Sequence, residues 1–205
     1  MAQLKSAVDY SDMDAIVIVS PENLRYAADV QFTSQLKIRD RLTFIVWPKG
    51  GEPLIIVCLV WEPLVRRSSW IQDLRTYREF EVSPIQIVVD VLKELNLSKG
   101  RIGYEGEYLA GRYCDELRGA LPDCQFSECD DLLARVRMIK TPEEIALLRN
   151  AYCGTASALQ DTFKSAKVGE TERTLSRRLS NNILKSGANS VAGMVMGAGE
   201  NTGLH

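Results

Sequence analysis

Hydrophobic residues along the first 133 positions gather in short runs, and turn-forming residues separate these runs. The β-branched run DAIVIV (14–19) stops at Ser20-Pro21, which is typical of a buried strand. Two apolar runs within RLTFIVWPKGGEPLIIV (41–57) flank a Pro-Lys-Gly-Gly turn and predict a hairpin. We expect further short strands at 70–77, 101–106 and 124–126.

Helical periods alternate with these strands. PENLRYAAD (21–29) predicts a turn and a short helix, and another helix is expected over 107–120. A third helix begins at Ser83-Pro84, with one apolar face that recurs at three- and four-residue steps: Ile85, Val88, Val89, Leu92 and Leu95. This alternation predicts that residues 1–133 form an α/β domain.

A second unit is predicted over residues 134–205. Thr141 and Glu144 have the spacing of a capping box, with Pro142 at the first helical position. A second helix is expected from Thr171, with Gly187 as its C-terminal cap. SVAGMVM (190–196) predicts a strand, and GAGEN (197–201) a turn.

The composition restricts the possible partners. The 205 residues carry a formal net charge of −2 and no basic stripe, which argues against a nucleic-acid partner. The most apolar segment, Leu54–Trp61, is too short to cross a membrane, and the N-terminus does not resemble a signal peptide, so we expect a cytoplasmic protein. The five cysteines include no C-x-x-C pair, and we interpret them as reduced structural thiols, although the spacing of Cys124 and Cys129 raises a metal or redox alternative.

The sequence lacks the common motifs of dinucleotide binding and of serine nucleophiles. The glycines of Gly197-Ala-Gly199 lack the third glycine of a dinucleotide fingerprint, and there is no G-x-S-x-G elbow. We assign Asp130 and Asp131 to a solvated turn, and Asp161 and Glu172 to exposed helix faces. The single histidine, His205, is the last residue.

Four segments in order nevertheless resemble the pita-bread metallopeptidase family of aminopeptidase P, prolidase and creatinase. P-x-N-x-x-Y occurs at Pro21, Asn23 and Tyr26, although the glycine that commonly follows the tyrosine is replaced in YAAD. The other three matches are R-x-I-K-T-x-x-E at 137–144, G-x-T-E at 169–172 and the glycine-asparagine turn before His205. The resemblance implies a creatinase-type N-terminal α/β domain (1–133) followed by an incomplete α+β pita-bread domain (134–205).

The resemblance also implies a site. His205 matches the histidine that contacts substrate in the peptidases and handles a proton in creatinase, so we take His205 as the candidate catalytic residue. Intact peptidases of the family bind two divalent ions, such as Mn or Co, through Asp, His and Glu ligands that come later in their chains. We therefore expect no metal or other cofactor bound by this chain alone.

Three interpretations follow from the resemblance. In the first, the chain is a truncated hydrolase that is inactive alone. Intact relatives of such a hydrolase cleave C–N bonds in an Xaa-Pro peptide, creatine or a cyclic amidine such as ectoine. Alternatively, it is a non-catalytic module that forms a homodimer or caps a homologous subunit, or it is a degenerate product without function. The cluster Arg39-Asp40-Arg41 either reaches a neighbour's substrate, as in creatinase-like relatives, or forms a solvated loop.

Overall fold

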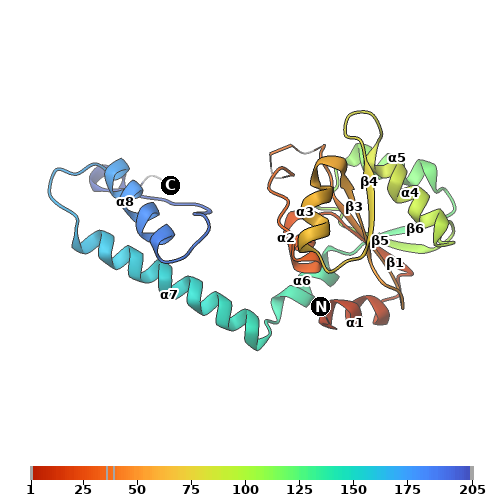
Figure 1. Ribbon diagram of the computed structural model, residues 1–205, viewed down its shortest axis with the longest axis horizontal. Coiled ribbons are helices and arrows are strands. Elements are labelled where there is room, and N and C mark those ends of the chain that lie inside the picture. Colours follow the sequence, from red (N-terminus) through yellow and green to blue (C-terminus); the bar gives the residue numbers. More distant parts are fainter. Residues whose placement is uncertain (1, 36, 39, 204–205) are drawn as a thin grey trace. The chain divides into compact units, whose positions relative to one another are not determined.

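A computed structural model describes residues 2–35, 37–38 and 40–203. The chain forms two compact units, residues 1–139 and 140–205 (Figure 1). The expected boundary after residue 133 falls inside helix α6 (Asp130–Met138), which belongs to the first unit. The sheet lies entirely in the first unit, and the predicted α/β class is confirmed.

The first unit contains a six-stranded sheet with the order β4-β3-β2-β1-β5-β6. Its strands are β1 (Ala15–Ile18), β2 (Phe44–Pro48), β3 (Leu54–Cys58), β4 (Asp73–Tyr77), β5 (Arg101–Tyr104) and β6 (Gln125–Glu128). β2 runs antiparallel to both neighbours, and β1–β5, β5–β6 and β3–β4 are parallel pairs. The predicted hairpin is therefore β2–β3, where Gly50 adopts a φ of 69° in the connecting turn.

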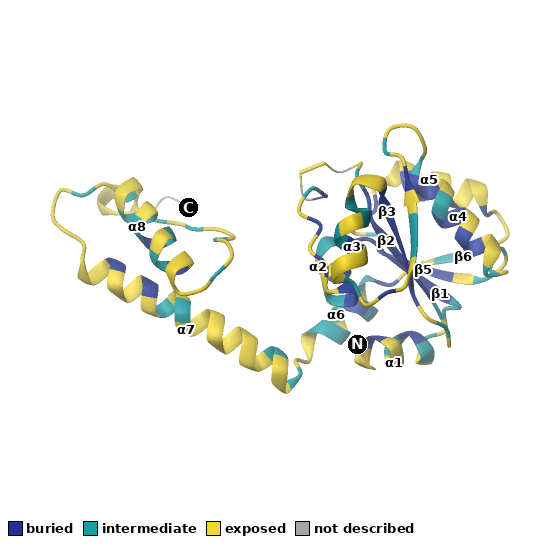
Figure 2. Ribbon diagram, viewed as in Figure 1, coloured by how far each residue is buried: buried dark blue, intermediate teal, exposed yellow. Residues whose placement is uncertain are grey.

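Helices cover both faces of this sheet (Figures 1 and 2). Alternate residues of each strand point to opposite faces, so Val17 and Val46 lie in one core cluster while Ile16 and Ile45 lie in the other. Helices α4 (Pro84–Glu94) and α5 (Gly111–Ala120) pack on the first face. On the second face lie α1 (Ala2–Tyr10), α2 (Pro21–Ala28), α3 (Glu62–Ser68), preceded by the 3-10 turn η1 (Leu59–Trp61), and α6.

Some elements of this unit differ from the sequence prediction. The helix expected from residue 107 begins at Gly111, because the preceding residues form a turn in which the Leu109 N–H donates to the Glu105 carbonyl. Asp130 and Asp131, expected in a solvated turn, are the first residues of α6, where acidic side chains stabilise the start of a helix. Helices α1 and α3 were not predicted at all.

The second unit consists of α7 (Pro142–Lys164), α8 (Glu172–Lys185) and a 3-10 turn, η2 (Gly199–Gly203). The predicted capping box is present, with Thr141 Oγ1 accepting from the Glu144 N–H and Glu144 Oε2 accepting from the Thr141 N–H. Gly154 allows close packing of the two helices, since a Cβ there would lie 2.9 Å from Ser186 Oγ. The buried residues are few: Ala158, Thr162, Leu179 and Ile183.

The strand predicted at 190–196 is absent from the described residues, which are irregular over this range. A strand requires a partner for its backbone groups, and the described part of this unit offers none. Within the described residues, no helix is both long and apolar enough to span a bilayer.

Candidate functional site

The carboxyl ends of five strands share one edge of the sheet. β1, β3, β4, β5 and β6 run in the same direction, because β2 alone is antiparallel to its neighbours. From β1 the chain continues to β2 on one side, while β5 occupies the other side. The strand order therefore changes direction between β1 and β5. Such a place is a topological switch point, where open α/β sheets commonly bind ligands at the carboxyl ends of their strands.

The carboxylate of Glu105 fills the crevice between β1 and β5. Its Oε2 accepts from the N–H groups of Val19 and Ser20, with the latter contact at 2.8 Å. Its Oε1 accepts from Asn23 Nδ2 over 2.6 Å, and the residue is only 2% exposed. An anion of the chain itself therefore occupies the N-terminal end of α2, where such folds often bind a phosphate.

These contacts explain the P-x-N-x-x-Y motif in physical terms. Pro21 is the first residue of α2, behind the N-cap Ser20, and Asn23 ties the helix to Glu105. Tyr26 lies on the same helix and packs against the core of the second sheet face. The motif thus anchors α2 to the carboxyl edge of the sheet.

The segment between α2 and β2 is fastened to the same edge. The Gln35 side chain is 1% exposed, donates to the Val19 carbonyl over 2.5 Å and accepts from the Thr43 N–H over 3.0 Å. The Tyr77 hydroxyl donates to the Leu42 carbonyl over 2.6 Å. Burial raises the pKa of Tyr77, so this phenol remains protonated and able to donate.

Two members of the predicted charged cluster are in ion pairs. The Arg41 guanidinium binds the Glu79 carboxylate through two nitrogens, and both side chains are largely covered. Asp40 pairs with Arg112. A purely solvated loop does not describe Arg41, and Arg39 lies outside the described residues; contact with a neighbour's substrate stays a prediction.

Two depressions open at this edge. One of about 400 Å³ is lined by Gln35, Leu42, Glu107, Tyr108, Leu109, Ala110 and Tyr113. The second, of about 370 Å³, includes Asp40, Phe80, Arg112 and again Tyr113 in its wall. The Tyr113 hydroxyl contacts Arg112 Nη2 at 2.8 Å and Asp40 Oδ1 at 3.3 Å. Hydrogen-bonding and charged groups thus surround an aromatic wall, an arrangement suited to a small polar ligand.

The described residues do not fit the two-ion centre that the resemblance implies for intact peptidases. Among them, no three His, Cys, Asp or Glu side chains lie close enough to hold a metal. The five cysteines are free thiols, and burial raises the pKa of the Cys129 thiol well above its ordinary value. His205, the candidate catalytic residue, lies outside the described residues, so its role stays a prediction.

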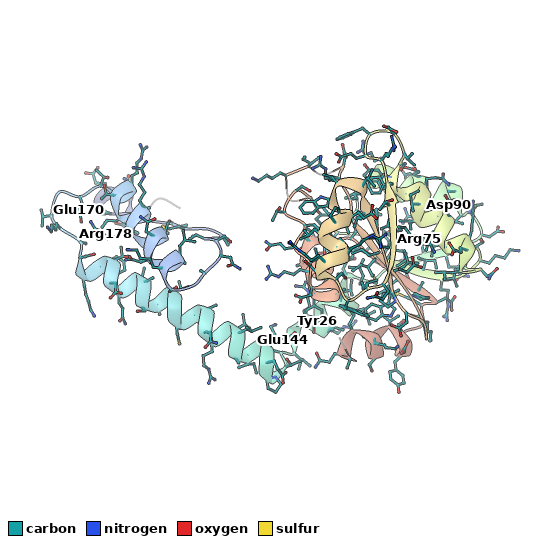
Figure 3. All side chains as sticks on the ribbon, in the orientation of Figure 1. Tyr26, Arg75, Asp90, Glu144, Glu170 and Arg178 are labelled. Atoms are coloured by element: carbon teal, nitrogen blue, oxygen red, sulfur yellow. The ribbon has the colours of Figure 1, made fainter. Side chains whose placement is uncertain are left out.

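In the second unit, the G-x-T-E motif forms the start of α8. Gly169 has a φ of 89°, Thr171 caps the helix by accepting from the Thr174 N–H, and Glu170 pairs with Arg178 (Figure 3). Glu172 was assigned to an exposed helix face, but its Oε1 accepts from the Ala198 N–H over 2.7 Å and from Asn201 Nδ2 over 3.2 Å. The spacing of residues along the helix gave no signal of this contact, because its partners lie 26 and 29 residues away.

Comparisons with known proteins agree with this fold. The creatinase/prolidase N-terminal domain matches residues 1–139. An Xaa-Pro dipeptidase of Lactobacillus helveticus is 24% identical over 178 residues, which are 86% of this chain and 47% of that protein. The chain thus spans about half the length of the curated relatives it matches.

Solved structures show the same fold at low identity. An Xaa-Pro dipeptidase from Bacillus anthracis has a TM-score of 0.75 at 22% identity, covering 92% of this chain and 49% of its own. An X-Pro aminopeptidase from Thermotoga maritima has a TM-score of 0.77 at 19% identity, covering 94% and 51%. With the domain match over 139 of 205 residues, the family resemblance is confirmed. The chain belongs to the creatinase/prolidase family, whose N-terminal domain it contains.

Proposed function

We propose that this chain supplies the N-terminal domain and the first helices of the catalytic domain to a hydrolase of small Xaa-Pro peptides. The observation that carries the proposal is the domain match, continued into the second unit by the 178-residue similarity to an Xaa-Pro dipeptidase. The C–N bond of a small amidine is the alternative substrate within the same family resemblance.

In this proposal, residues 1–205 do not hydrolyse peptides by themselves. The described carboxylates are used in other ways: Glu105 is enclosed by backbone and amide donors, Glu144 closes a capping box, and Glu170 pairs with Arg178. A two-ion hydrolase needs several carboxylates converging at one place, and the described residues offer no such group. The metal ligands would come from additional sequence or from a complementary chain.

A chimera tests the hydrolase proposal. Residues 1–205 are joined to the part of the Lactobacillus helveticus Xaa-Pro dipeptidase that lies beyond its similarity to this chain. We expect hydrolysis of Ala-Pro by the chimera only with Mn²⁺, and background rates from either part alone. Hydrolysis of Ala-Pro by purified residues 1–205 with stoichiometric manganese would contradict the proposal, as would a folded, metal-loaded chimera that cleaves no Xaa-Pro peptide.

A second candidate function is pairing with another copy or with a homologous chain. The observation that favours it is the apolar face of α7, which is exposed along most of its length (Figure 2). Its side chains are 39% to 76% exposed: Ile145, Leu148, Tyr152, Leu159 and Phe163. Exposed apolar surface of this kind commonly marks an interaction site.

Sedimentation of the purified chain tests this second function. We expect a dimer that becomes a monomer in the double variant Leu148→Glu/Tyr152→Glu, because charges on this face would oppose its burial. The control is Glu143→Lys/Arg149→Glu, which changes charges on the same helix without touching its apolar face. A monomeric wild-type chain at micromolar concentration would contradict self-association.

A further inference from the structure

The depression of about 400 Å³ at the carboxyl edge of the sheet has a buried amide in its wall. This amide belongs to Gln35, which is 1% exposed. Its Oε1 accepts from the Thr43 N–H over 3.0 Å, and its NH₂ group donates to the Val19 carbonyl over 2.5 Å. One backbone donor and one backbone acceptor therefore fix both the position and the orientation of the amide.

The second hydrogen of this NH₂ group is poorly used. Within the described part of the chain, the further acceptor that Gln35 Nε2 reaches is the Tyr108 hydroxyl, at 3.5 Å, which is long for a hydrogen bond. The Tyr108 hydroxyl finds no acceptor for its own hydrogen among the described residues. Two neutral donors thus lie next to each other in the wall, and each can still donate one hydrogen.

The remaining wall of this depression is mostly apolar. Leu42, Leu109 and Tyr113 line it and belong to the buried cluster on the first face of the sheet. The Tyr77 hydroxyl, which donates to the Leu42 carbonyl, holds this part of the wall in place. Pockets for small molecules typically combine such an apolar wall with a few placed polar groups. The wall therefore suits the body of a small ring compound.

The charge at the depression disfavours anions. Glu107 is the charged residue of its lining, and this carboxylate has no ion pair within the described residues. Arg112 does not line the depression, and its guanidinium is bound to Asp40. An anionic ligand would lose hydration and meet a carboxylate, with only neutral donors to receive it. An uncharged carbonyl oxygen can accept from the same two donors without that penalty.

We propose that this depression binds a small ring compound through an uncharged carbonyl group, as in an amide or a ketone. The carbonyl oxygen accepts from Gln35 Nε2 and from the Tyr108 hydroxyl, and the ring lies against Leu42 and Leu109. This inference goes beyond the proposed hydrolase, because the site lies entirely in the first unit and none of its residues performs a chemical step. It assigns a ligand class to the carboxyl edge of the sheet.

Nuclear magnetic resonance titration of residues 1–205 tests the proposal. The probes are benzamide and cyclohexanone, which carry an uncharged carbonyl, and benzoate, which has the size of benzamide but is anionic. The readouts are the side-chain NH₂ signals of Gln35 and the backbone amide of Leu109. Tyr108→Phe removes one donor and keeps the ring, and Tyr10→Phe is its matched control on the exposed surface of α1. Glu107→Gln tests the role of charge.

We expect saturable shifts at both readouts with benzamide and cyclohexanone, and binding of benzoate about tenfold or more weaker than that of benzamide. Tyr108→Phe should weaken benzamide binding about fivefold, because a hydrogen bond between neutral groups is lost. Tyr10→Phe should leave it unchanged. Glu107→Gln should strengthen benzoate binding about twofold to fivefold and leave benzamide binding unchanged, because the repulsive charge is exposed and screened by solvent.

The inference is overturned if neither carbonyl probe gives saturable shifts up to its solubility limit, or if benzoate binds as tightly as benzamide. It is also overturned if Tyr108→Phe binds benzamide as wild type does, or if Tyr10→Phe weakens binding equally. Circular dichroism checks that each variant is folded, and the exposed position of Glu107 keeps the charge test independent of any loss of stability in Tyr108→Phe.

Discussion

At the scale of single residues, the buried carboxylate of Glu105 joins β1, α2 and the end of β5 in the first unit. It satisfies two backbone N–H groups after β1 and one side-chain amide of α2. Glu105→Ala would leave these three donors buried without partners, and we expect a loss of about 3 kcal/mol or more in the free energy of unfolding. Urea denaturation measures this loss.

The neighbouring Glu107→Ala serves as the control for Glu105→Ala, since Glu107 is exposed and its change should stay within about 0.5 kcal/mol. Glu105→Gln should also destabilise the unit, because its NH₂ group would face an N–H donor. Equal stability of the Glu105 and Glu107 variants would show that the crevice accepts water in place of the carboxylate.

Contacts between residues close in sequence could be predicted, whereas contacts between distant residues could not. The capping box of Thr141 and Glu144 was predicted completely, because its partners are three positions apart and the helix geometry brings them together. Glu105 and Val19 are 86 residues apart, and only the pairing of β1 with β5 brings them together. Glu172 was missed for the same reason. The sequence therefore predicts local caps and leaves the long-range carboxylate contacts unassigned.

At the scale of elements, apolar periodicity predicted the strands and helices that bury several apolar side chains in the core. α4 was placed by its five-residue face, and β1 by its β-branched run. The short helices α1 and α3 bury only two and one residues, so their pattern is too weak to stand out. The strand predicted at 190–196 failed because its apolar pattern has no partner strand within the described residues.

The connection between α7 and α8 predicts a dependence on pH. Hydrogen bonds from Arg178, and then from the Lys167 N–H, lower the pKa of the Glu170 carboxyl below its usual value. A carboxyl whose pKa is lower in the folded state stabilises that state above the unfolded pKa, about 4.3, and loses this contribution as the pH falls through the folded value. We therefore expect the α7–α8 connection to loosen below about pH 4.

Carbon-13 titration of the Glu170 carboxyl measures this effect. Arg178→Gln should raise the pKa of Glu170 toward its ordinary value, while Arg173→Gln, an exposed arginine of the same helix, should leave it unchanged. An identical Glu170 titration in wild type and Arg178→Gln would show that the ion pair does not form in solution.

At the scale of the whole molecule, the two units differ in how much core they contain. The first unit has apolar clusters on both faces of a six-stranded sheet, whereas the second buries three apolar side chains between two helices. Because burial of apolar surface is the main favourable term in folding, the first unit should contain nearly all of the stability. Residues 1–139 should therefore unfold cooperatively, with a midpoint in urea close to that of the first unit in the whole chain.

The end of the first unit can be tested by comparing fragments that stop at residue 133 and at residue 139. Cutting after residue 133 removes the second half of α6, including Val136. The Val136 side chain packs against the apolar cluster on the second face of the sheet, to which Leu133 and α1 also contribute. We expect residues 1–133 to lose about 1–3 kcal/mol relative to residues 1–139, through fraying of α6 and exposure of this apolar contact. Urea denaturation of the two fragments decides the matter. Equal stability would place the working boundary at residue 133 and would leave the end of α6 as a linker to α7, whereas the expected difference makes α6 an integral part of the N-terminal domain.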